Sequence, residues 1–588
     1  MNWNKEFDDA AVERVRADVA YICDEIPSRL AGSEAGKRMA HFSAAGLRKA
    51  GLDPVVHEIS GLVSFPQRCQ LKLLTPTPET LECNTLGHST QTPPNGITAA
   101  LIDCGAGGYG DYAGKDVKGK IALVELSYHP GRHAKQRIAA ELGAIGCVMM
   151  NWGPPDSTWI PYGSVKPAWG NPTPESFRDE MAVLPCVGLS RADGLRLRTR
   201  LCAEQVTVNL HTNVENGWRP VHVTTADLKA DGSDDFVVIG GHQDSWEGPQ
   251  ATDNAAGNAC MLELARFFTR HQDKLRRGVT FGFWTGHETG TMVGSTWYVD
   301  NQWERLRRHA VGYLQIDQPA CAGTTRWGSV SNSELRAMME QVDASLLGNI
   351  PRAWRRTVKV GDASFFGIGV PMFAGQGVFT TEELKVSANA SLGWWHHTTE
   401  NTIDKIEWPA MALHLRMYAA YVWRLCTDPV IPCDFTAVAD DVIARLGELQ
   451  KGTSFPGLDR AMQKTLQLKT GATELAEACA RVTRGCEQGD ALAEAHACEL
   501  NQAIKRLSRL LLPMCGTVKG TYGHDPYAYT PQTTMLPSLH EVPQLAGMPQ
   551  SEPRWLLETK LVREVNRVCD TLDDAGDVIR LVLKAQQA

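Results

Sequence analysis

The sequence predicts an α/β protein with a mainly parallel mixed sheet covered by helices, a β-rich insert and a C-terminal helical domain. Three observations support this. Apolar strand-like runs and amphipathic helices alternate over residues 216–430, which is typical of a parallel sheet with helices on both faces. Short strands rich in Gly and Pro fill residues 62–215. Residues 431–588 show apolar positions at helical spacing.

The first two segments of the chain differ in the secondary structure that they predict. Residues 1–61 contain two amphipathic helices followed by a strand at 54–59, and we assign them to the N-terminal part of the catalytic domain. Residues 62–215 form the insert. Within it, the stretch 120–150 predicts a strand, a helix and a second buried strand, which is a βαβ-like unit in an otherwise β-rich region.

The catalytic segment, residues 216–430, carries the strongest alternation. Its predicted elements are strands at 236–239, 279–284 and 312–316 and a helix at 254–268. The helical segment, residues 431–588, ends in a helix predicted at about 558–584, and its apolar stripes comprise Phe435, Val438, Val442, Leu446 and Leu449, then Ile504, Leu507 and Leu511. These stripes exceed what covering a catalytic domain requires, so we expect a homodimer formed through this domain.

Composition excludes several classes of function. The net charge is -8 and there is no basic run, so we expect neither nucleic acid nor an anionic membrane as a partner. The N-terminus lacks the apolar core of a signal peptide, and no apolar run is long enough for a membrane span. The 16 cysteines include no CxxC pair, which is typical of reduced, buried thiols. We expect a soluble, cytoplasmic protein.

Metal-binding side chains follow the predicted strands of the catalytic segment. They are His242, Asp253, Glu288, Asp317 and His397. The carboxyl ends of strands in an open α/β sheet meet where ligands bind. Each residue alone has an ordinary explanation, such as a helix N-cap for Asp253, but all five positions share this placement. Two imidazoles and three carboxylates suit two borderline divalent ions with one bridging carboxylate.

The motifs around these residues resemble peptidase family M28, the zinc aminopeptidases and carboxypeptidases. The resemblance rests on Gly241-His242-Gln243-Asp244, Asp253-Asn254-Ala255-Ala256-Gly257, His287-Glu288-Thr289-Gly290, Asp317 and His397-Thr398-Thr399-Glu400-Asn401. The insert resembles a protease-associated domain. The C-terminal segment is similar to the dimerisation domain of glutamate carboxypeptidase and the transferrin receptor.

The resemblance implies two divalent ions, with zinc as the expected metal. His242 and Asp317 would bind one ion, Glu288 and His397 the other, and Asp253 would bridge them. Asp244 would be the carboxylate that fixes the tautomer of His242, because metal-bound imidazoles usually need such a partner.

His287 departs from the family pattern, which has a glutamate general base at this position. An imidazole can accept a proton near neutrality, so His287 is a candidate substitute base. Two alternatives remain open: His287 binds a metal, or it only packs in a site whose chemistry has drifted. The exchange also removes a negative charge beside the metals, which would change the preferred substrate.

The sequence therefore predicts a dinuclear-metal-dependent hydrolase of amide bonds, by resemblance an exopeptidase acting on short peptides. One alternative is an amidohydrolase of a small non-peptide amide or N-acyl amino acid, favoured by His287. A second is a non-catalytic binding or scaffold protein. Trp246, Trp395 and His396 lie within a few positions of the predicted ligands, so we expect them to line an apolar substrate pocket.

Overall fold

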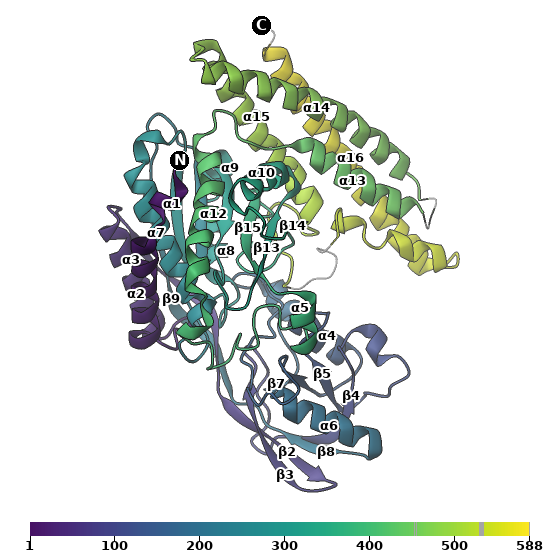
Figure 1. Ribbon diagram of the computed structural model, residues 1–588. Helices are drawn as coiled ribbons and strands as arrows, with labels where there is room; N and C mark the ends of the chain where they lie inside the picture. Colours follow the sequence, from purple (N-terminus) through teal and green to yellow (C-terminus); the bar gives the residue numbers. More distant parts are fainter. Residues whose placement is uncertain (452, 454, 528–533, 587–588) are drawn as a thin grey trace.

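The computed structural model describes residues 1–451, 453, 455–527 and 534–586. Its centre is an eight-stranded sheet with the strand order β1-β9-β11-β10-β12-β15-β13-β14. Figure 1 labels β9, β13, β14 and β15 of this sheet. The eight strands span Val55–Pro66 (β1), Val214–Leu228 (β9), Phe236–His242 (β10), Gly278–Trp284 (β11), Ala310–Gln315 (β12), Arg326–Ser331 (β13), Arg352–Arg356 (β14) and Met372–Val378 (β15).

The middle of the sheet is parallel and its flanks are mixed. β10 pairs in parallel with β11 and β12, and β12 pairs in parallel with β15. β9 runs antiparallel to β11 and β1, and β13 runs antiparallel to β15. The predicted mixed α/β fold is confirmed, with its parallel pairs concentrated where the predicted site residues follow the strands.

Both faces of the central strands are buried, which explains their uninterrupted apolar sequences. Val237 and Ile239 of β10 belong to the core under one helical layer, whereas Val238 belongs to the core on the opposite face. The Trp284 ring lies across two strands, because a Cβ on Gly240 or Gly282 would come within 2.4 or 2.0 Å of it. Glycine at these two positions makes room for that ring.

Helices cover both faces of the sheet. One layer contains α2, α3, α7 and α12, which pack against each other and against β9 and β10; they span Asp9–Glu25, Glu34–Lys49, Ala256–Arg270 and Trp408–Thr427. The other face is covered in part by α8 and α9, Val293–Asn301 and Trp303–His309. The remaining helices of this region are α1 (Trp3–Glu6), α10 (Arg336–Leu346) and α11 (Thr381–Val386).

The insert folds around a closed barrel of strands in the order β2-β3-β7-β6-β5-β4-β8. The strands span Arg68–Thr75 (β2), Glu79–Thr85 (β3), Ile97–Asp103 (β4), Ile121–Glu125 (β5), Gly146–Met150 (β6), Cys186–Leu189 (β7) and Thr207–Leu210 (β8). Its helices are α4 (Arg132–Glu141), α5 (Pro174–Glu180) and α6 (Arg191–Ala203). The predicted βαβ unit is present, because β5 and β6 pair in parallel and α4 connects them.

The C-terminal segment is a bundle of four long helices, which Figure 1 shows at the end of the molecule opposite the insert. They are α13 (Phe435–Gln450), α14 (Leu458–Glu487), α15 (Ala491–Gly516) and α16 (Glu552–Ala585). α16 begins earlier than predicted, with Pro553 in its first turn, where the missing N–H of proline costs no hydrogen bond. No helix in the described part of the chain is both long and apolar enough to span a membrane.

The apolar stripes that predicted a dimer are buried within the single chain. Phe435, Val442 and Leu449 of α13 and Ile504 and Leu507 of α15 belong to one continuous core with the sheet and the other tail helices. Packing inside the bundle and against the catalytic domain therefore accounts for these stripes. A dimer interface has to use other surfaces.

Candidate metal centre and active site

Three of the site residues lie at the carboxyl ends of three adjacent parallel strands, at one edge of the sheet. His242 is the last residue of β10, Glu288 follows the end of β11, and Asp317 follows the end of β12. Asp253 lies in a π-helical turn, Ala251–Ala255, that precedes α7. The predicted helix start at residue 254 was therefore slightly early, and Asp253 is not the N-cap of α7, which is Ala255.

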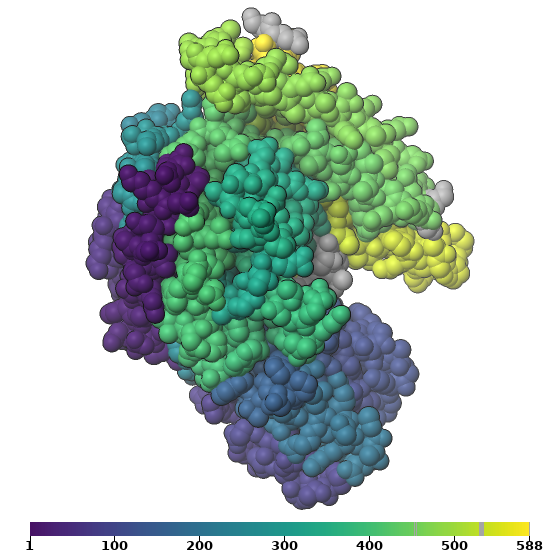
Figure 2. Space-filling view, viewed as in Figure 1, coloured from purple at the N-terminus to yellow at the C-terminus, as the bar shows by residue number. Residues whose placement is uncertain are grey.

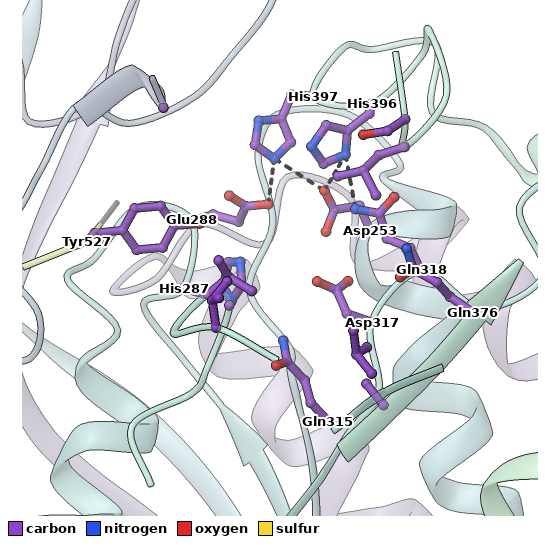
Figure 3. A pocket seen from close by; sticks show the side chains of 18 of the residues that line it. Asp253, His287, Glu288, Gln315, Asp317, Gln318, Gln376, His396, His397 and Tyr527 are labelled. Atoms are coloured by element: carbon purple, nitrogen blue, oxygen red, sulfur yellow. Dashed lines mark hydrogen bonds and ion pairs between the residues drawn. The ribbon is translucent and has the colours of Figure 1, made fainter. Parts of the chain in front are cut away.

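The five predicted ligands lie together with Asp253 in the middle, and Figure 3 labels four of them, Asp253, Glu288, Asp317 and His397. One oxygen of Asp253, Oδ1, lies 3.1 Å from Nε2 of His242, which is itself 3.5 Å from Oδ1 of Asp317. The other oxygen, Oδ2, lies 3.3 Å from Nε2 of His397, which is 3.1 Å from Oε1 of Glu288. Asp253 thus separates two pairs, each made of one imidazole and one carboxylate.

The electrostatics of the cluster favour added positive charge. Burial alone would raise the pKa of Asp253, but His242, His396 and His397 hold this pKa well below its ordinary value. Burial would likewise raise the pKa of Glu288, yet the neighbouring His397 brings it down to about 2. Burial would lower the pKa of His242, whereas Asp253 and Asp317 raise it well above its usual range. The neighbouring imidazoles therefore favour the ionised forms of Asp253 and Glu288.

The residues fit a pair of divalent ions. Nε2 of His242, Oδ2 of Asp253 and Oδ1 of Asp317 are buried atoms that lack a hydrogen-bond partner among the described residues. Nitrogen and carboxylate oxygen without thiolate suit zinc and similar borderline ions. Such cations would replace the imidazole protons, because a metal-binding imidazole has to be neutral.

The structure corrects the predicted role of the Asp244 side chain. Nδ1 of His242 lies 2.9 Å from the backbone carbonyl oxygen of Asp244 but 3.9 Å from its carboxylate, which is too far for a hydrogen bond. The carboxylate instead accepts the backbone N–H groups of His287 and Glu288, at 3.1 and 3.0 Å. Asp244 thus orients His242 through its backbone and holds the loop after β11 through its side chain.

Two further contacts hold the ligands in place. The indole N–H of Trp246 donates to Oε2 of Glu288 at 2.7 Å, leaving Oε1 directed at His397. The buried guanidinium of Arg29 donates to the carbonyls of Pro249 and Gln250 at 2.8 and 3.2 Å, just before the turn that carries Asp253. Such partners outside the ligand shell fix ligand orientation in metal sites.

His287 forms a pair with a residue that the sequence did not identify. Its Nδ1 lies 2.8 Å from Oδ2 of Asp362, a fully buried carboxylate. The hydroxyl of Ser295 donates to the other oxygen of Asp362 at 2.8 Å. Burial and the neighbouring His242 would lower the pKa of His287, but Asp362 raises it. A proton on Nδ1 that is donated to Asp362 leaves Nε2 as the basic nitrogen.

The site opens into a cavity of about 650 Å³. His287, Glu288, Asp317, His396 and His397 line it, together with side chains of the insert such as Trp152 and with Tyr527 from the segment after α15 (Figure 3). Asp253 and Lys166 also line the cavity at this end. The insert and the C-terminal segment therefore both help to shape the space in front of the candidate metal centre.

Two of the three residues predicted for the substrate pocket lie elsewhere. Trp246 and Trp395 are 1% and 6% exposed and do not line the cavity. Their prediction was wrong, because proximity in sequence to a ligand does not set the direction of a side chain. His396 does line the cavity, with Nδ1 3.1 Å from Oδ2 of Asp253 and its ring stacked on Trp152 at 5.4 Å. His287 also lies with His242 and Glu288 in a group close enough to hold an ion.

Comparison with known proteins gives family matches for two parts of the chain. Residues 224–422 match peptidase family M28, and residues 96–197 match the PA domain. Aminopeptidase YwaD of Bacillus subtilis is 28% identical over 50% of this chain and 59% of its own length. A probable glutamate carboxypeptidase, VP8 of Zea mays, is 25% identical over 49% of this chain and 48% of its own length.

A solved structure shares the fold. A zinc aminopeptidase from Bacillus subtilis superposes with a TM-score of 0.54 at 19% identity, covering 71% of this chain and 96% of that one. At this identity the likeness establishes the fold. The chain spans about half the length of the curated relatives named above, 59% and 48%.

Proposed function

We propose that this chain, which belongs to peptidase family M28, is a dinuclear-metal-dependent hydrolase that cleaves amide bonds of short peptides as an exopeptidase. The observation that carries the proposal is the position of Asp253, whose two oxygens face separate imidazole–carboxylate pairs. The similarity to aminopeptidases and to a probable glutamate carboxypeptidase supports the reaction class.

His242, Asp317 and Oδ1 of Asp253 would hold one ion, and Glu288, His397 and Oδ2 of Asp253 the other. Two bound divalent ions supply Lewis-acid chemistry and make water acidic enough to react near neutral pH. Trp246 and the backbone of Asp244 keep Glu288 and His242 in position for this task.

His287 would act as the general base and acid. Its Nδ1 faces Asp362, so Nε2 is free to take the proton of the attacking water and later return it to the leaving nitrogen. Asp362 holds the ring in this tautomer and stabilises the charged form, the same task that an aspartate performs for histidine in a serine protease. The fully buried position of Asp362 keeps this contact away from solvent.

A second candidate function is hydrolysis of a small non-peptide amide or of an N-acyl amino acid. The observation that favours it is His287, because an imidazole replaces the carboxylate expected beside the ions. A carboxylate base can also attract a substrate ammonium group, whereas an imidazole paired with Asp362 offers no such charge. This candidate shares the metal centre and the base with the first.

We expect protein reconstituted with zinc to hydrolyse at least one substrate in a panel of aminoacyl, acyl-amino-acid and simple amide compounds. A strong chelator should abolish the hydrolysis, and added zinc should restore it, because the Lewis acid is essential to the mechanism. The measurement is release of product by liquid chromatography. If zinc-loaded protein cleaves nothing in the panel, the alternative of a non-catalytic binding or scaffold protein is favoured instead.

We also propose that the protein is a homodimer formed through the helical bundle. The support is a set of large apolar side chains that stay exposed on α14 and α16: Leu466, Trp555, Leu556, Val562 and Leu581. We expect light scattering at micromolar concentration to report about twice 64.4 kDa, because exposed apolar side chains gain most by association. The double variant Trp555→Asp/Leu556→Asp should shift the mass toward the monomer. A parent protein of 64.4 kDa would contradict the proposal.

A further inference from the structure

The insert contributes a buried segment to the surroundings of the metal centre. Residues 161–170 lie between β6 and α5, and all of them are buried although none belongs to a helix or a strand. Figure 2 shows the insert packed directly against the catalytic domain. Buried backbone groups outside regular structure need other partners. The N–H of Tyr162 donates to the carbonyl of His397 at 2.7 Å, and that of Gly170 donates to the carbonyl of Thr291 at 2.5 Å. We call residues 161–170 the strap.

One charged side chain of the strap contacts the loop after β11. Lys166 is 1% exposed, and its Nζ donates to the backbone carbonyls of His287 and Glu288 at 2.7 and 3.0 Å. Burying an ammonium group is costly unless hydrogen bonds compensate for the lost water, so these two carbonyls account for the position of the side chain. They belong to the candidate base and to the proposed metal ligand next to it.

A second charged side chain holds the same piece of backbone. The carboxylate of Asp244 accepts the N–H groups of His287 and Glu288. All four backbone polar groups of these two residues therefore bind either one anion or one cation, and hydrogen bonds to charged groups are stronger than neutral ones. Asp244 follows β10 of the catalytic domain, whereas Lys166 comes from the insert. The catalytic domain alone thus supplies only half of this arrangement.

A chain of side chains also leads from the strap to the imidazole of His287. The indole N–H of Trp169 donates to Oγ of Ser364 at 2.9 Å, and this oxygen lies 2.9 Å from Oγ of Ser295. Ser295 in turn donates to Asp362, the partner of His287. The strap is therefore linked to the candidate base twice, directly at its backbone and indirectly at its ring. The direct link is the hydrogen bond from Lys166.

We propose that Lys166 is a positioning residue, whose ammonium group fixes the backbone of His287 and Glu288 and so keeps the base in place beside the metal-binding carboxylate. The base and the ligand are neighbours in the chain, so a rotation of the peptide between them would change the distance from the base to the attacking water. Lys166 limits this rotation. The inference rests on the proposed hydrolase function, and it gives the insert a part in the reaction beyond shaping the cavity.

The test is Lys166→Met in zinc-loaded protein, assayed with the best substrate of the panel. Methionine keeps an unbranched side chain but removes the ammonium group. We expect kcat to fall by roughly 10- to 10²-fold, because a displacement of about 1 Å at a reacting group costs up to this factor. KM and zinc content should stay as in the parent, because the ligand side chains are untouched. Lys166→Gln keeps a shorter donor and should lower kcat by a smaller factor, so it serves as the test if the methionine variant does not fold.

The matched control is Lys135→Met. Lys135 is a fully buried lysine of the same insert, and its Nζ also donates to two backbone carbonyls, those of Ala106 and Tyr128. Both carbonyls belong to the insert, and Lys135 does not line the cavity. We expect this variant to lose thermal stability, as Lys166→Met does, but to keep the kcat of the parent. The comparison separates the loss of a buried ammonium group from the loss of its contact with the base.

The double variant Lys166→Met/His287→Ala shows whether the effect passes through the base. It should be no slower than His287→Ala alone, because a residue that acts by placing His287 has nothing left to place. The inference is overturned by a parental kcat in whichever Lys166 variant folds, by an equal fall of kcat in Lys135→Met, or by a further loss in the double variant. A parent protein that cleaves no compound of the panel contradicts the proposed hydrolase function itself, and the inference with it.

Discussion

Asp253→Ala should lose both metal ions together and lower kcat/KM by at least about 10³-fold, because Lewis-acid stabilisation is worth several kcal/mol. The reason is geometric: each oxygen of Asp253 faces one imidazole–carboxylate pair. Asp253→Asn is the isosteric companion that tests whether charge or shape matters. Metal content by elemental analysis and hydrolysis by chromatography are the two measurements, and circular dichroism verifies that the variants fold.

The control for Asp253 is Asp317→Ala, which removes a ligand from one pair only. Its carboxylate lies 3.5 Å from Nε2 of His242 and is not part of the pair formed by His397 and Glu288. We expect this variant to lose one ion and keep the other. Retention of both ions by Asp253→Ala would show that Asp253 is not a bridge, and the proposed arrangement of ligands would have to be abandoned.

His287→Ala should lower kcat by roughly 10²- to 10⁴-fold, the usual worth of a positioned proton acceptor, while both ions stay bound. Asp362→Asn should lower kcat through the same imidazole, because an amide at this position can leave the ring in the wrong tautomer. Since Asp362 acts through His287, the double variant should be no slower than His287→Ala alone. His287→Glu restores the carboxylate of the family and should recover part of the activity.

Ser295→Ala is the matched control for Asp362. It removes the donor to Oδ1 of Asp362 but leaves the contact between Oδ2 and His287 in place. We expect a much smaller loss of kcat than for Asp362→Asn, with unchanged metal content. If His287→Ala turns over substrate as fast as the parent, His287 is not the base. If it loses one ion, His287 is a ligand, as its distance to His242 and Glu288 permits.

The parts of the fold that could be predicted are those with strong periodicity. The apolar runs of β10 and β11 are buried along their whole length, so their pattern alone identified them. The turn before α7 was harder, because Asp253 and Asn254 leave helical dihedral angles there and only the contacts around them explain this. Asn254 donates to the carbonyl of Ile316 at 2.9 Å, a partner far away in the sequence.

The structure brings the predicted ligands together. Two features of the sequence indicated them, namely the spacing of the motifs and their position after the predicted strands. Asp362 carried no such signal. Asp362 reaches His287 from a loop 75 positions later. The prediction for Trp246 was wrong for the opposite reason. Its nearness to His242 was visible in the sequence, but its indole points to Glu288 and not into the cavity.

The most direct test of the central claim is the number of metal ions per chain. Protein purified without chelator and then saturated with zinc should contain two ions per chain by elemental analysis, and hydrolysis in a zinc titration of the metal-free protein should reach its plateau at two equivalents. A plateau at one equivalent, or hydrolysis that persists in metal-free protein, would contradict the dinuclear mechanism.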